Sequence, residues 1–194
     1  MVELQDFFKK EKIIAAVRNE KQLQKAVNAP IAAIFLLAGD INVLADYVDY
    51  ARGHHIPVFP HLDLMGGIAG DKAAVKFIAR EIRPDGIITT RSTLIKAAKK
   101  HDLRTIQRLF LVDSTAVETG IHAVEENQPD AVEIMPGLMP KIISQVKSRI
   151  GKPIIAGGLI EDQEDIDQVL NAGALAVSIG NSDLWWYNQD KQSS

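Results

Sequence analysis

The sequence lacks several features that would mark particular classes of protein. It contains no cysteine, which excludes disulfide bonds, thiolate metal sites and a cysteine nucleophile. It has no apolar run approaching the roughly 20 residues that a membrane-spanning helix needs. Its first residues, MVELQDFFKKEK, lack the apolar centre of a secretory signal. We therefore expect a cytoplasmic protein.

An excess of positive charge is also missing. The 22 Lys and Arg residues are outnumbered by 25 Asp and Glu residues, which gives a net charge of −3 at pH 7. The strong positive field that most simply indicates nucleic-acid binding is therefore absent. Basic residues gather only locally, in KAAKKHDLR (96–104) and over 141–152. Helical spacing favours ordinary solvation of these side chains, and only proximity on neighbouring elements would make a nucleic-acid surface.

What remains is the composition of an ordinary globular protein. Hydrophobic residues make up 46% of the 194 residues and charged residues 24%. We expect one domain over residues 1–188, followed by a polar tail over residues 189–194.

Short apolar runs alternate with segments of helical period. Continuous apolar runs are typical of strands that are covered on both faces, as in a parallel sheet. The predicted strands are 13–17, 32–37, 57–63, 85–90, 105–112, 130–135, 153–158 and 174–180. Eight such units are the number at which a parallel sheet closes, so we predict an α/β fold, a compact (β/α)8 TIM-type barrel. An open doubly wound sheet is the alternative, but it would place a glycine-rich turn after the first strand, where AAVRNEKQ has none.

Segment ends also carry recognisable residues. Asp71, Ser92, Ser114 and Asp162 stand where helix N-caps are expected. Aromatic residues at 7–8 and 185–187 could cover the two barrel openings. Two adjacent tryptophans cannot easily both point inward, so one could face a partner subunit or a nucleic-acid base, but a crowded terminal helix is the interpretation we favour.

In this fold the working residues lie at the carboxyl ends of the strands. The candidates for ligand binding there are Arg18, His61, Asp63, Arg91, Gln107, Arg108, Glu133, Gly157, Gly158, Gly180 and Asn181. The loops after strands seven and eight usually form the phosphate site of such barrels, because bare backbone N–H groups can approach the oxygens. The glycines at 157, 158 and 180 therefore predict a phosphate cradle, with a simple tight turn as the alternative for the first two.

Three acidic or imidazole side chains allow several kinds of chemistry. Period-two alternation places His61 and Asp63 on one face of a strand, and Glu133 faces the barrel interior by the same argument. They could bind ligand hydroxyls, transfer protons as in a sugar-phosphate isomerase, or simply order the barrel. A metal on these three residues is a weak alternative, and we expect none. No lysine stands at a predicted strand end, so a Schiff-base aldolase lacks its nucleophile.

The strand-end motifs together resemble a known family. AAVR, HLDLMGGI, GIITTRS, TIQRLFLVDS, VEIMPGLMPK, IIAGGLI and GNSDLW resemble, in order and spacing, the glycerol uptake operon antiterminator regulatory proteins. The resemblance extends from about residue 13 to residue 185.

The resemblance implies a function as well as a fold. It implies a (β/α)8 fold and a cytoplasmic regulator, not an enzyme, that responds to sn-glycerol 3-phosphate and acts on leader mRNA. It implies that Gly157, Gly158, Gly180 and Asn181 hold the phosphate, that the other candidates complete the pocket, and that no cofactor is needed. An isomerase or synthase acting on a small phosphorylated substrate is the alternative, and a homo-oligomer stays open.

Overall fold

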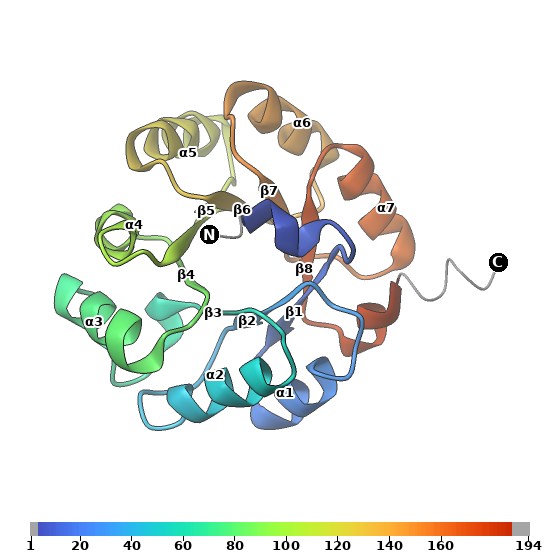
Figure 1. Cartoon of the computed structure of the whole chain (residues 1–194). Coiled ribbons are helices and arrows are strands. Elements are labelled where there is room, and N and C mark those ends of the chain that lie inside the picture. Colours follow the sequence, from blue (N-terminus) through green and yellow to red (C-terminus); the bar gives the residue numbers. More distant parts are fainter. Residues whose placement is uncertain (1–3, 188–194) are drawn as a thin grey trace.

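The computed structural model describes residues 4–187, which form a ring of strands surrounded by helices (Figure 1). The strands are β1 (Ile13–Val17), β2 (Ala33–Leu36), β3 (Val58–Pro60), β4 (Gly86–Thr89), β5 (Arg104–Phe110), β6 (Ala131–Met135), β7 (Ile154–Gly157) and β8 (Ala176–Ile179). All neighbouring strands are parallel, in the order β3-β2-β1-β8-β7-β6-β5-β4. The predicted barrel is confirmed, and the open doubly wound sheet is wrong. The predicted tail at 189–194 lies outside the described residues.

The ring has one seam. Between β3 and β4 the regular ladder is replaced by a single bridge, His61 with Ile88. At the other end of the seam the Asp85 backbone N–H donates to Val58 O at 3.1 Å, and the Asp85 carboxylate accepts the Val58 N–H at 2.9 Å. The barrel is therefore nearly closed, with fewer backbone hydrogen bonds here than elsewhere.

The described residues include seven α-helices. Figure 1 shows the helices on the outside of the barrel. They are α1 (Glu20–Ala26), α2 (Leu44–Gly53), α3 (Lys72–Phe77), α4 (Ser92–Lys99), α5 (Ser114–Asn127), α6 (Pro140–Arg149) and α7 (Gln163–Asn171). The shorter turns are η1 (Leu4–Phe8), η2 (Leu62–Leu64), η3 (Ile78–Ile82) and η4 (Ser182–Trp186). The short η4 stands where an eighth helix would complete the ring, which helps the chain close a barrel with so few residues.

Side chains cap several helices, and two of the four predicted N-caps are confirmed. Asp71 and Asp162 are N-caps, each accepting a backbone N–H three residues on. Ser92 and Ser114 are instead the first residues of their helices, so those two cap predictions are wrong by one position. Asp113 caps α5 in place of Ser114, because its carboxylate reaches the backbone N–H of the third residue on.

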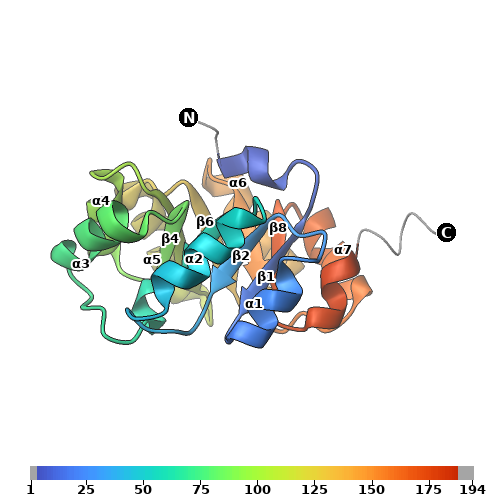
Figure 2. The same cartoon turned by 60° about the horizontal axis from the view of Figure 1, so that its bottom comes forward.

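The barrel interior is apolar at the end nearest the chain start. Side chains such as Phe35, Phe59 and Ile106 fill it, and Phe8 of η1 is fully buried against them. Figure 2 shows η1 lying across this end of the barrel. The predicted lid at residues 7–8 is confirmed.

The second predicted lid is wrong. Trp185 is buried on the flank, where η4 contacts α1, β1 and β8, and its indole N–H donates to Ile179 O at 2.9 Å. Trp186 is only partly buried and lies beneath the Lys25 ammonium. The two tryptophans do diverge, as their adjacency requires. Among residues 4–187, no helix is long and apolar enough to cross a membrane.

We expect Phe8→Ala to lower the free energy of unfolding by about 3 kcal/mol, because a large buried ring leaves a cavity. Phe77→Ala is the matched control, since that ring is 40% exposed. Urea unfolding followed by circular dichroism measures both. Equal losses of unfolding free energy in the two variants would contradict the conclusion that Phe8 of η1 is packed in the barrel opening.

Candidate functional site at the barrel mouth

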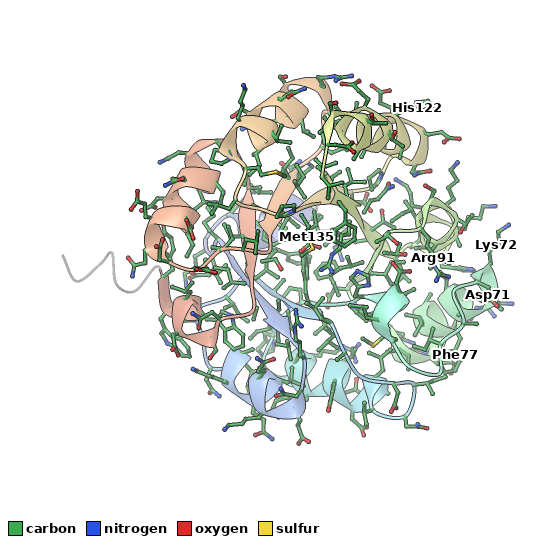
Figure 3. All side chains as sticks on the ribbon, turned by 180° about the vertical axis from the view of Figure 1, so that it is seen from behind. Asp71, Lys72, Phe77, Arg91, His122 and Met135 are labelled. Carbon is green, nitrogen blue, oxygen red and sulfur yellow. The ribbon has the colours of Figure 1, made fainter. Side chains whose placement is uncertain are left out.

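The carboxyl ends of the strands meet at the end opposite η1, which we call the barrel mouth. Figure 3 looks from that side, with Met135 near the centre and Arg91 between the centre and α3. The candidate residues are distributed around this end, and most come from the ends of β3 to β8.

The centre of the site is a buried ion pair. The sheet register sets Arg108 of β5 beside Glu133 of β6, and the Arg108 Nε–H donates to Glu133 Oε2 at 2.6 Å. Burial raises the pKa of the Glu133 carboxyl, and the Arg108 guanidinium and Ser178 hydroxyl oppose that rise without cancelling it. Oε1 of Glu133 is buried and accepts no hydrogen bond from residues 4–187. The prediction that Glu133 faces the interior is confirmed, and one of its oxygens is free to accept from a ligand.

Glycine makes room for this carboxylate. A Cβ added to Gly157 would lie 2.6 Å from Glu133 Oε1, too close for any real side chain. Gly137 is equally constrained, because its Cβ would lie 2.6 Å from the Gly157 nitrogen. Gly157 therefore has a steric reason to be glycine, apart from any contact with phosphate.

Asp63 is held from the neighbouring strand end. Its carboxylate accepts the Thr89 hydroxyl at 2.9 Å, and the Thr90 backbone N–H and hydroxyl at 2.7 and 2.9 Å. Arg91 Nε lies 3.3 Å away. Burial alone would raise the pKa of Asp63, but the hydrogen bonds from Thr90 and Thr89 outweigh it and hold the pKa below its usual value. Asp63 is therefore an ionised carboxylate whose acceptor positions are largely occupied.

His61 is buried and unpartnered. Only 2% of the residue is exposed, and neither ring nitrogen has a hydrogen-bond partner among the described residues. Burial, aided by the charge of Arg108, lowers its pKa to about 4, so the ring is neutral near pH 7. A neutral imidazole offers one donor and one acceptor. The period-two argument for His61 and Asp63 is wrong, because β3 ends at Pro60 and residues 62–64 form η2, yet Nδ1 of His61 still lies 3.9 Å from Asp63.

The glycine-bearing loops leave neighbouring strands. Gly157 pairs with Ser178 in the β7–β8 register, so Gly158 and Gly180 emerge side by side. Gly158 has a φ of +80°, a conformation that favours glycine. The space beside Gly180 is open, since an added Cβ would find Ala16 O at 4.0 Å and nothing nearer. Asn181 accepts the Asp183 backbone N–H and begins η4. This arrangement suits the predicted cradle.

The other candidates separate into two groups. Arg18 is exposed directly after β1, and Arg91 is half exposed beside Asp63, so both can present positive charge at the mouth. Gln107 is not brought to the site. Its side chain points outward and accepts from the Asn127 amide of α5 at 3.2 Å, so it orders the contact between sheet and helix. Neighbouring strand residues alternate between the two faces, which is why Arg108 points inward and Gln107 does not.

Sequence reasoning missed Ser178. It is 5% exposed and affects the pKa of Glu133 from β8. A single hydroxyl in the otherwise apolar run ALAVSIG was the available signal. Within residues 4–187, no group of three or more acidic or histidine side chains could hold a metal ion. The alternative of a metal on His61, Asp63 and Glu133 therefore finds no support in this geometry.

Residues 13–185 match the family described as glycerol-3-phosphate responsive antiterminator. The chain belongs to this family. It is also 35% identical over 173 residues to the uncharacterized protein YgcP of Escherichia coli, a match that covers 89% of this chain and 91% of that protein.

Two solved structures of similar proteins agree with this family assignment. The glycerol uptake operon antiterminator regulatory protein of Listeria monocytogenes is 38% identical with a TM-score of 0.90, covering 95% of this chain and 98% of that one. A glycerol uptake operon antiterminator-related protein of Thermotoga maritima is 30% identical with a TM-score of 0.80, covering 90% and 98%. The resemblance drawn from the strand-end motifs is confirmed.

We expect His61 to make the free energy of unfolding of the protein depend on pH. The unfolded chain binds a proton near the ordinary histidine pKa of 6.5, whereas folded His61 binds one only near pH 4. Stability conferred by the neutral ring is therefore complete above pH 6.5 and falls by about 3 kcal/mol as the pH drops to 4.

His61→Gln should remove that part of the pH dependence, measured by urea unfolding between pH 7 and pH 4.5. The control is His122→Gln, because the side chain of His122 is 81% exposed on α5. An unchanged slope for His61→Gln would show that the ring is not buried neutral.

Proposed function

We propose that this protein binds sn-glycerol 3-phosphate at the barrel mouth and, in response, controls antitermination through the leader mRNA of a glycerol uptake operon in the cytoplasm. Membership of the glycerol-3-phosphate responsive antiterminator family supports the proposal. The observation that carries it is the pair of unpartnered buried groups, His61 and Oε1 of Glu133, around Arg108. Buried polar atoms are normally satisfied, so these point to a polar ligand.

The two ends of the ligand fit two parts of the mouth. The phosphate binds backbone N–H groups of the loops at Gly158 and Gly180; the space beside Gly180 is open, whereas the Met135 side chain lies close beside Gly158. The two hydroxyls of glycerol both donate and accept, which suits a carboxylate oxygen and a neutral imidazole. Arg18 and Arg91 at the rim balance the charge of the phosphate. Specificity then comes from leaving these buried atoms unsatisfied when a hydroxyl is missing.

One observation favours an enzyme as the second candidate. A carboxyl whose pKa is raised by burial, as in Glu133, is typical of a general acid. An isomerase or synthase would convert the bound phosphate ester, and Glu133→Gln would abolish that conversion. Incubation of sn-glycerol 3-phosphate with the protein, followed by ³¹P NMR, separates the two functions. The regulator returns the ligand unchanged.

We expect a transcript of the glycerol uptake operon leader to be retarded in a native gel in a manner that depends on sn-glycerol 3-phosphate. Gly180→Asp should weaken ligand binding at least tenfold in calorimetry and abolish the ligand effect on the gel. The added carboxylate fits sterically but repels phosphate.

The matched control is Gly151→Asp, which adds the same charge in open space before β7, at the opposite end of the barrel. If both variants bind the ligand like the unaltered protein, the phosphate does not lie at Gly180. If the unaltered protein neither binds the ligand nor retards the transcript, the proposed function is wrong.

We also expect ligand binding to change tryptophan fluorescence. Trp185 and Trp186 follow the proposed cradle within η4, and Trp185 is anchored to Ile179 O at the end of β8. Ordering of the loop at Gly180 would therefore reach both indoles. A titration with sn-glycerol 3-phosphate measures the change, with Gly180→Asp as the control. A flat signal alongside calorimetric binding would reject the coupling.

A further inference from the structure

A basic hollow lies on the outer wall, between α3 and α4. It encloses about 600 Å³ and is lined by Lys72 of α3 and by Thr93, Lys96, Lys99, Lys100 and His101 of α4 and its end. We call it the α3–α4 groove. In Figure 3, Lys72 lies at the outer edge of the molecule on the side facing α4. In a chain with a net charge of −3, so many cations around one hollow are a local concentration and not a general property of the surface.

Part of this charge has no internal counterpart. Lys96 pairs with Glu126 at 3.3 Å, and Lys99 lies 3.9 Å from Asp130, so both are tied to the side of α5. Within residues 4–187, the side-chain ammonium groups of Lys72 and Lys100 make no ion pair or hydrogen bond. Two unneutralised ammonium groups, one at the start of α3 and one directly after α4, therefore remain available to an anionic partner.

The groove is connected to the barrel mouth. Arg91, the residue before α4, places Nε 3.3 Å from Asp63 and donates from Nη1 to Gly70 O at 3.4 Å, two residues before α3. The guanidinium lies directly over Gly70, where an added Cβ would meet it at 1.7 Å. One side chain thus joins the starts of both groove helices to a residue of the ligand site. The helices also flank the β3–β4 seam, where the sheet has only a single bridge.

We infer that the α3–α4 groove binds the phosphodiester backbone of RNA. The inference rests on the proposed function, which supplies an RNA partner, and adds the surface that contacts it. Lysine ammonium groups bind phosphates as point charges and carry no base recognition, so the groove positions the RNA while sequence is read elsewhere. Arg91 gives ligand at the mouth a route to bias this surface, because a ligand shifts an equilibrium only through contacts that differ between states.

The test compares two charge-matched double variants. Lys72→Gln with Lys100→Gln removes two unpaired cations from the groove. Lys147→Gln with Lys152→Gln removes two from a second hollow, beside the start of β7. Both are titrated with the operon leader transcript at several salt concentrations, in the presence of sn-glycerol 3-phosphate. Calorimetry with sn-glycerol 3-phosphate and thermal unfolding confirm that each variant is folded and binds ligand.

The groove variant should bind the transcript at least tenfold more weakly. It should also lower the slope of log affinity against log salt by roughly 1.4 to 1.8, since two phosphate contacts are lost. The control should match the unaltered protein in both. Normal transcript binding by the groove variant overturns the inference and leaves the proposed function standing, whereas no binding by the unaltered protein overturns both. Normal transcript binding with loss of antitermination in a purified transcription assay would assign the groove to an acidic protein surface, and the inference would again be wrong.

Discussion

The Arg108–Glu133 pair is the constraint around which the barrel mouth is organised. A carboxylate inside a barrel wall is costly unless it is paired, and the parallel register of β5 and β6 supplies the arginine directly beside it. The same carboxylate lies where a Cβ at position 157 would be, so that position is glycine. The charge of Arg108 also helps to keep His61 neutral. The buried pair thus sets the choice of residue at Gly157 and contributes to the charge state of His61.

The seam between β3 and β4 is held differently from the rest of the wall. Elsewhere backbone ladders join the strands, but here a carboxylate secures each end: Asp85 on Val58, and Asp63 on Thr89 and Thr90. The Asp63 carboxylate lies in the mouth and also contacts the Arg91 guanidinium. The part of the wall with the fewest backbone bonds is therefore also the part in direct contact with the candidate ligand site.

Much of this was predictable because a parallel barrel repeats a simple pattern. Buried strands read as apolar runs, and the carboxyl ends of parallel strands must meet, so the fold and most mouth residues followed from the sequence. The errors arose where the backbone departs from the regular alternation of strand and helix, or where the sequence does not show which face a strand residue occupies. The run at 57–63 reads as one strand, but the chain turns into η2 after Pro60. Gln107 and Arg108 are both polar in one strand, and only the register shows which of them points inward. The two ring nitrogens of His61 lack hydrogen-bond partners because of how the side chain packs in the folded protein, and no local sequence pattern predicts that packing.

The same packing fixes the charge state of the ionisable groups at the mouth. Acid–base catalysis needs groups that are free to exchange protons with a substrate. Asp63 is held as an ionised acceptor by three hydrogen bonds, and one oxygen of Glu133 is fixed by Arg108. His61 stays neutral because its burial disfavours the proton that an imidazole base would have to take. The unpartnered atoms that remain, the His61 ring nitrogens and Glu133 Oε1, therefore stand beside groups of fixed charge, which is the arrangement that the proposed binding of a polyol phosphate requires.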